Sequence, residues 1–568
     1  MKIPNISFLL VSLYLISMPG FSKAESTTYL PNVHRAYDFL EQMEHRFADK
    51  RFFIGTKPST RRKIAQCLFD LVIRRPEMTD TEKEEFDALI AEFGSDFSKR
   101  GGLVWEDGGP VERLPKFVRS YLYRNRRNFY SRDGDTYRIY LDPVIVRSAR
   151  IANAQGSGGR DNVYVSTNGF KMRGVVGERV GFHIDVRDSR EWGDSGFPTK
   201  TSTTMPGIGW AGFKGDHAEY DETYAHVTYS GGPFTLGYGR DRNVWGHGSR
   251  GTLLLSGYGA PYDMARIDTE FGPFRFTYFT GELKQYPPVA QFYYTSTNGS
   301  PADSVAVKKR ISGHRLEVRV NDRLSVGLHE AVIYAGRWEL SYLNPVMFLK
   351  GGEHFNGDHD NAAMGADFRY FVHRSHSVYG ELLIDDITTT KLGSSWYGNK
   401  LAWQIGTFLL FPFGISDSDV RIEYTRIQPW VYTHRFAINS YTHYGDVLGH
   451  ELGPNSDEVY FLARKRLSRR LRCSAGFTYS RHGGNTTITN VDGNTTKTNV
   501  GGDAHDGWSP GDSKSASFLA GDIDRRKAAT VSLSWEPAWE CFIKGAYTRE
   551  MINDIGSNIF TLSFGLQQ

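Results

Sequence analysis

From residue 135 onward, apolar side chains recur at every second position over many stretches of the chain. Five segments show this period clearly, with apolar residues at Val180, Phe182, Ile184 and Val186; Leu316, Val318 and Val320; Leu324, Val326 and Leu328; Val420, Ile422 and Tyr424; and Phe560, Leu562, Phe564 and Leu566. The positions between them are mostly charged or polar, so each segment is predicted to be a β-strand with two unlike faces. Such strands suit a β-sandwich, which buries the apolar face, or a transmembrane barrel, whose apolar face meets lipid around a wet lumen.

The connections between the predicted strands distinguish these two folds. Short turns are predicted near Gly177, 230–233, Gly272, 321–322, 374–375, 413–418, Ser468 and 536–540. Long polar loops are predicted at 149–161, 191–216, 242–261, 286–310, 336–361, 389–399, 429–456 and 482–525, with a shorter ninth loop near 551–556. Strict alternation of short and long connections is typical of outer-membrane barrels, and a sandwich has no reason to keep it. We therefore predict that residues 135–568 form an antiparallel transmembrane β-barrel of about eighteen strands in the bacterial outer membrane.

Residues 1–24 are predicted to be a secretory signal peptide. Lys2 supplies the positive start, an apolar run follows from Phe8 to Met18, and small residues stand at Ser22 and Ala24. The run is too short to cross about 30 Å of hydrocarbon as a helix. The mature chain is therefore expected to be exported.

Residues 30 to about 130 carry helical periodicity, and residues 25–134 are predicted to form a helical periplasmic or plug region. Helices are expected over residues 31–47, from Ser59 onward, and from the capping box of Thr79 and Glu82 to Gly94. A basic stretch follows at residues 113–132. It fits contact with phosphate-bearing lipid or polymer, and equally a solvated helix face.

Composition excludes several other classes of protein. The 68 Lys and Arg residues nearly balance 64 Asp and Glu residues, whereas nucleic-acid binding by bulk electrostatics needs clustered basic residues. Cys67, Cys473 and Cys541 are odd in number and far apart, which excludes a disulfide scaffold and a CxxC metal site. Segment 351–361 contains His, Asp and Glu, but its spacing fits neither an EF-hand nor HExxH. We expect a polar loop there, and no cofactor.

Segment 237–250, GYGRDRNVWGHGSR, is the densest candidate binding site. Arg240, Arg242 and Arg250 offer guanidinium forks that match carboxylates, Trp245 offers a flat face for a sugar ring, and His247 lies between them. This set would suit an acidic glycan. The alternative is an inward-folded loop whose arginines pair with acids of the lumen.

A second candidate consists of Trp430, Tyr432 and His434, where a predicted strand leaves the membrane. These residues could form a sugar platform, or part of the aromatic belt at the membrane interface. The sequence has no GxSxG, no HExxH and no Ser/His pair at a recognisable spacing, so we predict that the protein is not an enzyme.

Several short motifs resemble those of the Wzi family of capsule-assembly outer-membrane proteins. They are YDFL at 37–40, TKPS at 56–59, IA at 64–65, the acidic helix at 79–93, GR at 239–240, GHG at 246–248, LLLS at 253–256, ELSYLNP at 339–345 and YTR at 424–426. The resemblance implies an eighteen-stranded barrel whose periplasmic helices help to close its lower end. It also implies a lectin-like protein that attaches secreted polysaccharide to the cell surface.

We therefore expect a protein that binds capsular or other surface polysaccharide and contacts outer-membrane lipid and lipopolysaccharide. An outer-membrane porin or carbohydrate channel on the same barrel is the alternative, and an outer-membrane hydrolase is a third hypothesis.

Overall fold

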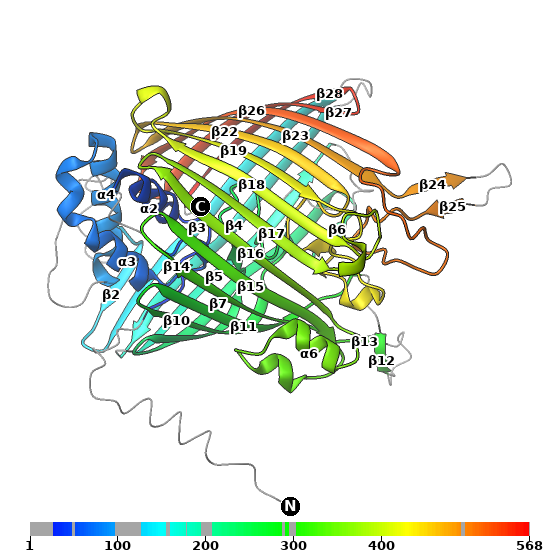
Figure 1. Cartoon of the computed structure of the whole chain (residues 1–568). Helices are drawn as coiled ribbons and strands as arrows, with labels where there is room; N and C mark the ends of the chain where they lie inside the picture. Colours follow the sequence, from blue (N-terminus) through cyan, green and yellow to red (C-terminus); the bar gives the residue numbers. More distant parts are fainter. Residues whose placement is uncertain are drawn as a thin grey trace, which may run out of the picture.

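The computed structural model describes residues 27–47, 52–96, 127–154, 160–177, 179–194, 207–286, 290–294, 303–489 and 495–566. The predicted signal peptide and most of the basic stretch lie outside the described residues. The dominant feature of the described residues is a closed antiparallel barrel of eighteen strands, which confirms the predicted fold (Figure 1). Two short strands, β2 (Tyr130–Asp133) and β6 (Gly212–Lys214), extend the sheet along β3 and β7.

The barrel strands follow one another around the ring in chain order. They are β3 (Tyr137–Ala154), β4 (Arg160–Val176), β5 (Val180–Gly193), β7 (His217–Gly231), β8 (Phe234–Asp241), β10 (Tyr262–Phe271), β11 (Phe274–Leu283), β14 (Lys309–Arg319), β15 (Leu324–Ala335), β16 (Asn361–His373), β17 (His376–Asp386), β18 (Lys400–Leu410), β19 (Ser418–Ile427), β22 (Ser456–Ser468), β23 (Leu471–Gly484), β26 (Asp522–Ala538), β27 (Cys541–Ile552) and β28 (Ile555–Leu566). The ring closes where β28 pairs with β3, from Ser557 opposite Ala154 to Leu566 opposite Ile145. Closure leaves no free sheet edge, as a β-sheet in lipid requires.

The two ends of the barrel differ as the sequence predicts. Short turns, including the one that contains η6 (Pro412–Gly414), join the strands at one end, which we call the turn end. The long connections lie at the other end, the loop end, where the ninth connection is only residues 553–554. The long connections contain β9 (Val244–Trp245), β12 (Ala290–Tyr294), β13 (Asp303–Ala306), η4 (Leu340–Leu343), α6 (Leu349–Phe355), η5 (Thr389–Lys391), η7 (Ala437–Asn439), β20 (Thr442–His443), β21 (Asp446–Val447), β24 (Thr486–Thr489) and β25 (Thr495–Thr498).

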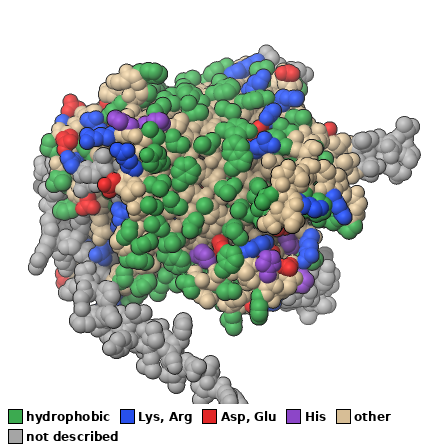
Figure 2. All heavy atoms as spheres, viewed as in Figure 1, with side chains coloured by type: hydrophobic (Ala, Val, Ile, Leu, Met, Phe, Trp, Pro, Cys, Tyr) green, Lys and Arg blue, Asp and Glu red, His purple; other side chains and the backbone are tan. Residues whose placement is uncertain are grey.

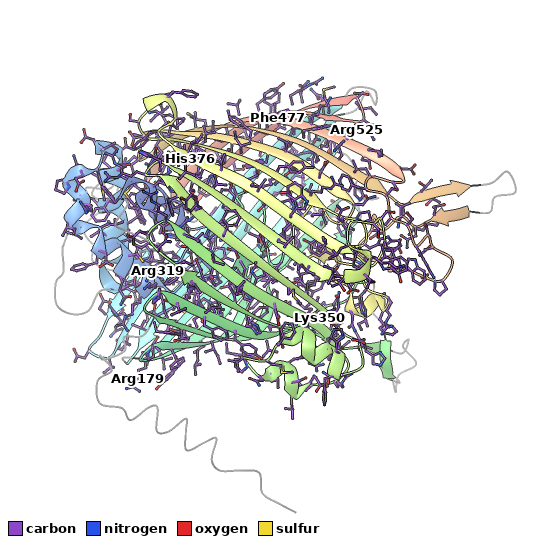
Figure 3. All side chains as sticks on the ribbon, in the orientation of Figure 1. Arg179, Arg319, Lys350, His376, Phe477 and Arg525 are labelled. Carbon is purple, nitrogen blue, oxygen red and sulfur yellow. The ribbon has the colours of Figure 1, made fainter. Side chains whose placement is uncertain are left out.

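Side chains separate between the outer wall and the lumen. Val531 and Leu562 on the outer wall are 60% and 56% exposed, whereas the lumen residues Arg315 and Asp367 are 1% and 2% exposed. Figure 2 shows a broad apolar surface over the strands, and Figure 3 labels Phe477 on this wall. The apolar face therefore points outward and the charged face inward, which fits a membrane barrel and excludes the sandwich.

Three helices precede the barrel and share a small apolar core. They are α2 (Arg35–Arg46), α3 (Arg61–Asp70) and α4 (Asp80–Phe93), with η1 (Val72–Glu77) and η2 (Gly94–Asp96) and the short strand β1 (Thr56–Lys57). The predicted capping box is present, because Thr79 and Glu82 each accept the backbone N–H of the other. The predicted start of the first helix at residue 31 is wrong. Val33 lies in the turn before the N-cap residue His34 and is 89% exposed.

The helices and the strand β1, which we call the helical cap (residues 27–47 and 52–96), dock against the turn end of the barrel (Figure 1). Three acidic side chains of α2 pair with barrel arginines: Asp38 with Arg464, Glu41 with Arg421, and Glu44 with Arg369. Gln42 also donates a hydrogen bond to Asp419 at 3.1 Å. Arg421 and Arg464 also lie near Asp419 of β19, so the acidic residues of α2 add to charge pairs of the lumen and hold the cap in place.

Acid is expected to loosen the helical cap. Burial, aided by Arg369, lowers the pKa of His45 to about 3, so the folded cap keeps this ring neutral. Burial alone would raise the pKa of Glu41, but Arg421 and Arg369 lower it well below its usual value. The stabilisation from His45 is therefore lost as the pH falls below about 6.5, and that from Glu41 as it falls below about 4.5. The urea concentration that abolishes the helical circular dichroism signal should be lower at pH 4 than at pH 7.

The variant Glu41→Gln should destabilise the docked cap at pH 7 by about 3 kcal/mol, because Arg421 loses its nearest acidic partner at a buried site. Between pH 5 and pH 4, the urea midpoint of this variant should also fall less than that of the unaltered protein. Glu84→Gln is the matched control, since Glu84 is exposed on α4. Equal urea midpoints for the two variants would show that the pair with Arg421 does not hold the cap.

Candidate functional site

The connection from β8 to β10, residues 242–261, folds into the lumen. Trp245 is fully buried, and its ring centroid lies 5.5 Å from that of Phe279 on β11. Residues 253–255 are buried with it in an apolar core that also includes Ile333 and Tyr432. An apolar core thus occupies the loop end of a lumen whose strands are otherwise lined with charges.

The helical cap reaches this inward-folded loop from the opposite end. β1 pairs antiparallel with β9 inside the barrel, and the N–H of Gly246 donates to the carbonyl of Gly55 at 2.8 Å. A Cβ atom on Gly55 would lie 2.9 Å from the ring of His247, so this close approach requires glycine. Chain segments from both ends therefore meet inside the lumen.

Two lumen carboxylates hold the loop by its backbone. Glu381 accepts the N–H groups of residues 253 and 254 at 3.0 and 3.2 Å. Glu423 accepts the N–H groups of residues 249 and 250 at 2.5 and 2.9 Å, and also the hydroxyl of Tyr379 at 2.7 Å. The buried backbone N–H donors of the loop are thus paired with the side-chain oxygens of buried acidic residues of the lumen, so both sets of polar groups are hydrogen-bonded.

The three predicted arginines lie in three different places. Strand register puts Arg240 on the outer wall, where it pairs with Asp263 of β10 at 2.7 Å. Arg242 donates to a backbone carbonyl of the preceding long loop. Arg250 lies inside and pairs with Glu451 and Glu458. Of the two alternatives for segment 237–250, the inward-folded loop whose arginines pair with acids therefore fits Arg250.

Trp245 is buried, the side chain of His247 is only 5% exposed, and His247 Nε2 lies 3.7 Å from Asp367. The structure does not bring these two side chains together with Arg240 and Arg242 on one surface. Direct sugar contact by the residues of segment 237–250 stays a prediction.

Trp430 and Tyr432 also face the interior, each 1% exposed. Both have a φ of 70°, a left-handed backbone that costs about 1–3 kcal/mol for a residue other than glycine. Tyr432 offsets this strain with two hydrogen bonds: its hydroxyl donates to Leu253 and its N–H to Asp385, both at 2.6 Å. His434 lies further out, where burial lowers its pKa to about 4 and keeps it neutral at pH 7.

The structure reveals a second aromatic group at the loop end that the sequence analysis missed. The rings of Tyr397 and Trp508 stack with centroids 4.6 Å apart, and Trp396 lies 4.8 Å from Tyr397. We call these three half-buried residues the aromatic platform. Trp430 lies beneath it, with its ring centroid 6.3 Å from that of Tyr397.

Backbone contacts fix the aromatic platform in place. The N–H of Tyr397 donates to Lys514 at 3.1 Å, and the N–H of Trp430 donates to Gly501 at 2.9 Å. Gly501 has a φ of 76°, and a Cβ there would lie 2.6 Å from the Trp430 ring. The ammonium of Lys391 lies 3.6 Å above the Trp396 ring. The platform depends on two loops far apart in the sequence, so neither loop alone predicts it.

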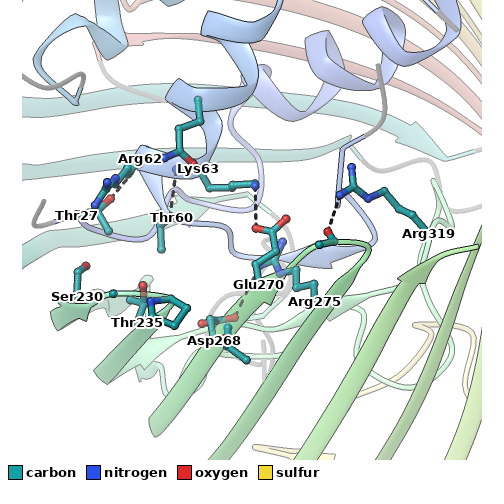
Figure 4. A pocket seen from close by; sticks show the side chains of 15 residues that line it. Thr27, Thr60, Arg62, Lys63, Ser230, Thr235, Asp268, Glu270, Arg275 and Arg319 are labelled. Atoms are coloured by element: carbon teal, nitrogen blue, oxygen red, sulfur yellow. Dashed lines mark hydrogen bonds and ion pairs between the residues drawn. The ribbon is translucent and has the colours of Figure 1, made fainter. Parts of the chain in front are cut away.

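A cavity of about 330 Å³ lies at the turn end, far from the platform (Figure 4). It is bounded by the start of α3 and by the turns that follow β7 and β10. Lys63 of the helical cap pairs there with Glu270 of the barrel at 3.0 Å. This cavity separates the cap from the barrel rim and belongs to their interface.

Segment 351–361 begins within α6, and its His354 pairs with Asp358 at 2.6 Å. Among the residues that the structure describes, no three His, Cys, Asp or Glu side chains gather where they could hold a metal ion. No described helix is long and apolar enough to cross a membrane.

Residues 144–541 match the sequence profile of the family described as capsule assembly protein Wzi. The chain belongs to this family. The match runs from β3 to the first residue of β27, and together with the barrel it places the protein in the bacterial outer membrane. None of the curated proteins compared with the chain matches it significantly.

The fold of the family recurs in a solved structure of Wzi from Escherichia coli, described as an outer-membrane, carbohydrate-binding β-barrel involved in group 1 capsule assembly. It is 13% identical, covers 95% of this chain and 100% of its own, and superposes with a TM-score of 0.53. Pseudomonas aeruginosa OccK8 covers 75% of this chain and 98% of its own at 9% identity, with a TM-score of 0.40. Acinetobacter baumannii OccAB1 covers 75% and 96% at 9% identity, also with a TM-score of 0.40.

The double variant Glu381→Gln, Glu423→Gln should release the inward-folded loop. Each buried carboxylate that is lost leaves backbone donors poorly paired, at a cost of about 1–3 kcal/mol each. Hydrogen exchange of residues 246–256 should accelerate, because the loop opens more often. Glu550→Gln is the control, since Glu550 pairs with Arg526 on neighbouring strands. Unchanged exchange in the double variant would mean that other contacts hold the loop.

Proposed function

We propose that the loop end binds capsular or other surface polysaccharide without cleaving it and so keeps the polymer on the cell. Membership of a capsule-assembly family supports this function, as does the carbohydrate binding described for the E. coli barrel of the same fold. The observation that carries the proposal is the aromatic platform, which stands half-exposed at the loop end of a barrel whose lumen is entered by chain segments from both ends.

The platform has the chemistry that a charged sugar polymer needs. Aromatic rings offer flat apolar faces, and Lys391 beside Trp396 offers a cation for a carboxylate of the polymer. The exposed Arg435 and the neutral ring of His434 lie on the loop that packs under Gly507, next to Trp508 in the chain. An acidic polysaccharide therefore suits this surface better than a neutral one.

The other predicted site residues take supporting roles in this proposal. Trp430 holds Tyr397 from below, while Trp245, Tyr432 and Arg250 keep the inward-folded loop in place. Arg240 and Arg242 lie at the edge of the loop end, and we assign them contacts with charged groups of the polymer or of lipopolysaccharide. The helical cap, at the turn end, is assigned to the periplasm.

Tyr397→Ala combined with Trp508→Ala should weaken binding of the producing strain's own surface polysaccharide. Two lost stacking contacts of about 1 kcal/mol each correspond to roughly 30-fold in the dissociation constant. Calorimetric titration of the purified protein measures this constant. Trp210→Ala is the matched control, because Trp210 is 69% exposed on a different long loop.

Equal losses in the control and the double variant would remove the platform from the proposal. The same samples address the hydrolase hypothesis. Gel filtration of the polymer after incubation should show an unchanged chain length.

The porin alternative predicts steady conductance, whereas obstruction of the lumen by the helical cap and the inward-folded loop predicts silence in a planar bilayer. Removing residues 30–126 should open only a small path, because residues 246–256 still occupy the lumen from the loop end. Shortening that loop in the same variant should give large, steady channels. Large channels from the full-length protein would instead support the porin.

A further inference from the structure

Most of the connection between β15 and β16, residues 336–360, lies on the outer wall of the barrel. Only its end reaches the loop after β19, where Asn439 donates a hydrogen bond to the carbonyl of His359 at 2.8 Å. The N–H of Leu349 donates to Glu330 of β15 at 2.7 Å, and the hydroxyl of Tyr278 of β11 donates to the carbonyl of Tyr342 at 3.0 Å. Leu349 and Tyr342 also pack against Val332 in a separate apolar cluster. We call residues 336–360 the wall segment; Figure 1 shows its helix α6 beside the strands, and Figure 3 labels Lys350 there.

The register of the barrel shows that these contacts are on the outside. Ala331 and Ile333 belong to the core inside the lumen, so Glu330 and Val332, which alternate with them, face outward. Tyr278 faces outward for the same reason, since its neighbour Phe279 packs on Trp245 inside.

The wall under the segment is unusually polar for a surface that faces lipid. The hydroxyls of Thr280 and Ser312 are hydrogen-bonded at 3.0 Å, and His314 Nε2 lies 3.7 Å from the carboxylate of Glu330. Nearer the turn end, the outer face of β14 and β15 is apolar and carries Leu316, Val318, Val326 and Leu328. Hydrocarbon in contact with Glu330 would be costly, and the wall segment covers this carboxylate and donates a hydrogen bond to it.

The outer side of the wall segment carries several large apolar side chains. Trp338 is 60% exposed, Leu340 80%, Val346 81%, Phe348 57% and Phe355 87%. The polar residues Arg337, Asn344, His354, Asp358 and His359 are exposed beside them. Scattered exposed apolar residues are ordinary, but five within eighteen positions of one short segment form a patch that requires a partner. Figure 2 shows apolar side chains at the lower edge of the molecule, where this segment lies.

We propose that the wall segment is inserted into the outer leaflet of the membrane, with its apolar side chains among the lipid chains near the head groups. The patch continues the lipid-facing wall, since Leu328 of β15 and Phe368 of β16 are exposed on the same side. Trp338 stacks on Arg310 of the outer wall at 4.5 Å, an arrangement suited to the boundary between lipid and water. This proposal requires the barrel to be in the membrane but not the polysaccharide function.

The test uses a single fluorescent label in the full-length protein in nanodiscs with one copy per disc. Cys473 and Cys541 are replaced by serine, Cys67 is left because it is buried, and Val346→Cys carries the label. Leu328→Cys, on the lipid-facing wall, is the positive control, and Ser509→Cys, exposed at the loop end, is the negative control. Lipids with a doxyl quencher on the acyl chain report contact with hydrocarbon.

Doxyl lipid should quench the label at 346 to an extent comparable with the label at 328, and leave the label at 509 bright. A label at 346 that stays as bright as the one at 509 would overturn the proposal. A second set of discs, with two copies each, tests whether another copy covers the patch. If the emission of the label at 346 shifts to the blue only in these discs, a second copy covers the patch and the proposal is overturned. Phe355→Cys repeats the measurement on α6 if the first label disturbs the segment.

Discussion

The hydrogen bonds between β28 and β3 impose the constraint on which the rest of the structure depends. Once the sheet closes, every second side chain points into a ring of eighteen strands, which is too wide for side chains alone to fill. The lumen must then hold either water or other parts of the chain. In this protein Arg315 of β14 and Asp367 of β16 pair across the intervening strand β15, and the helical cap and the inward-folded loop occupy part of the remaining space.

The filling and the lumen satisfy each other's polar groups. Acidic residues of α2 approach arginines of the strands at the turn end, while Glu381 and Glu423 approach backbone N–H groups at the loop end. Withdrawing either segment would leave charges in a poorly solvated site, so barrel and filling stabilise one another. This mutual dependence is the physical reason for treating the lumen as a support for the loops and not as a path.

The strands, turns and helices could be predicted from the sequence because their signals are local. Alternation, turn residues and the capping box of Thr79 and Glu82 each act within a few positions. Whether a loop folds into the lumen or away from it could not be predicted, because the contacts that decide this are distant in the sequence. Glu423, for example, accepts the N–H of Arg250 from 173 residues away. Arg240 shows the same limit, because a shift of one residue in the register of β8 would turn it from the outer wall into the lumen.

The aromatic platform combines rigidity with a small area, and both properties bear on how a polymer would be held. Trp430 adopts a strained backbone, and the loops on both sides of the platform are anchored. Binding of a sugar therefore costs little further conformational entropy of the protein. A few stacked rings still give only modest affinity for one repeat unit. A polysaccharide presents the same unit many times, and many barrels share one membrane, so one polymer can engage several copies at high effective concentration. On the proposed function, retention of the polymer therefore depends on the density of the protein in the membrane as strongly as on the contacts of a single site.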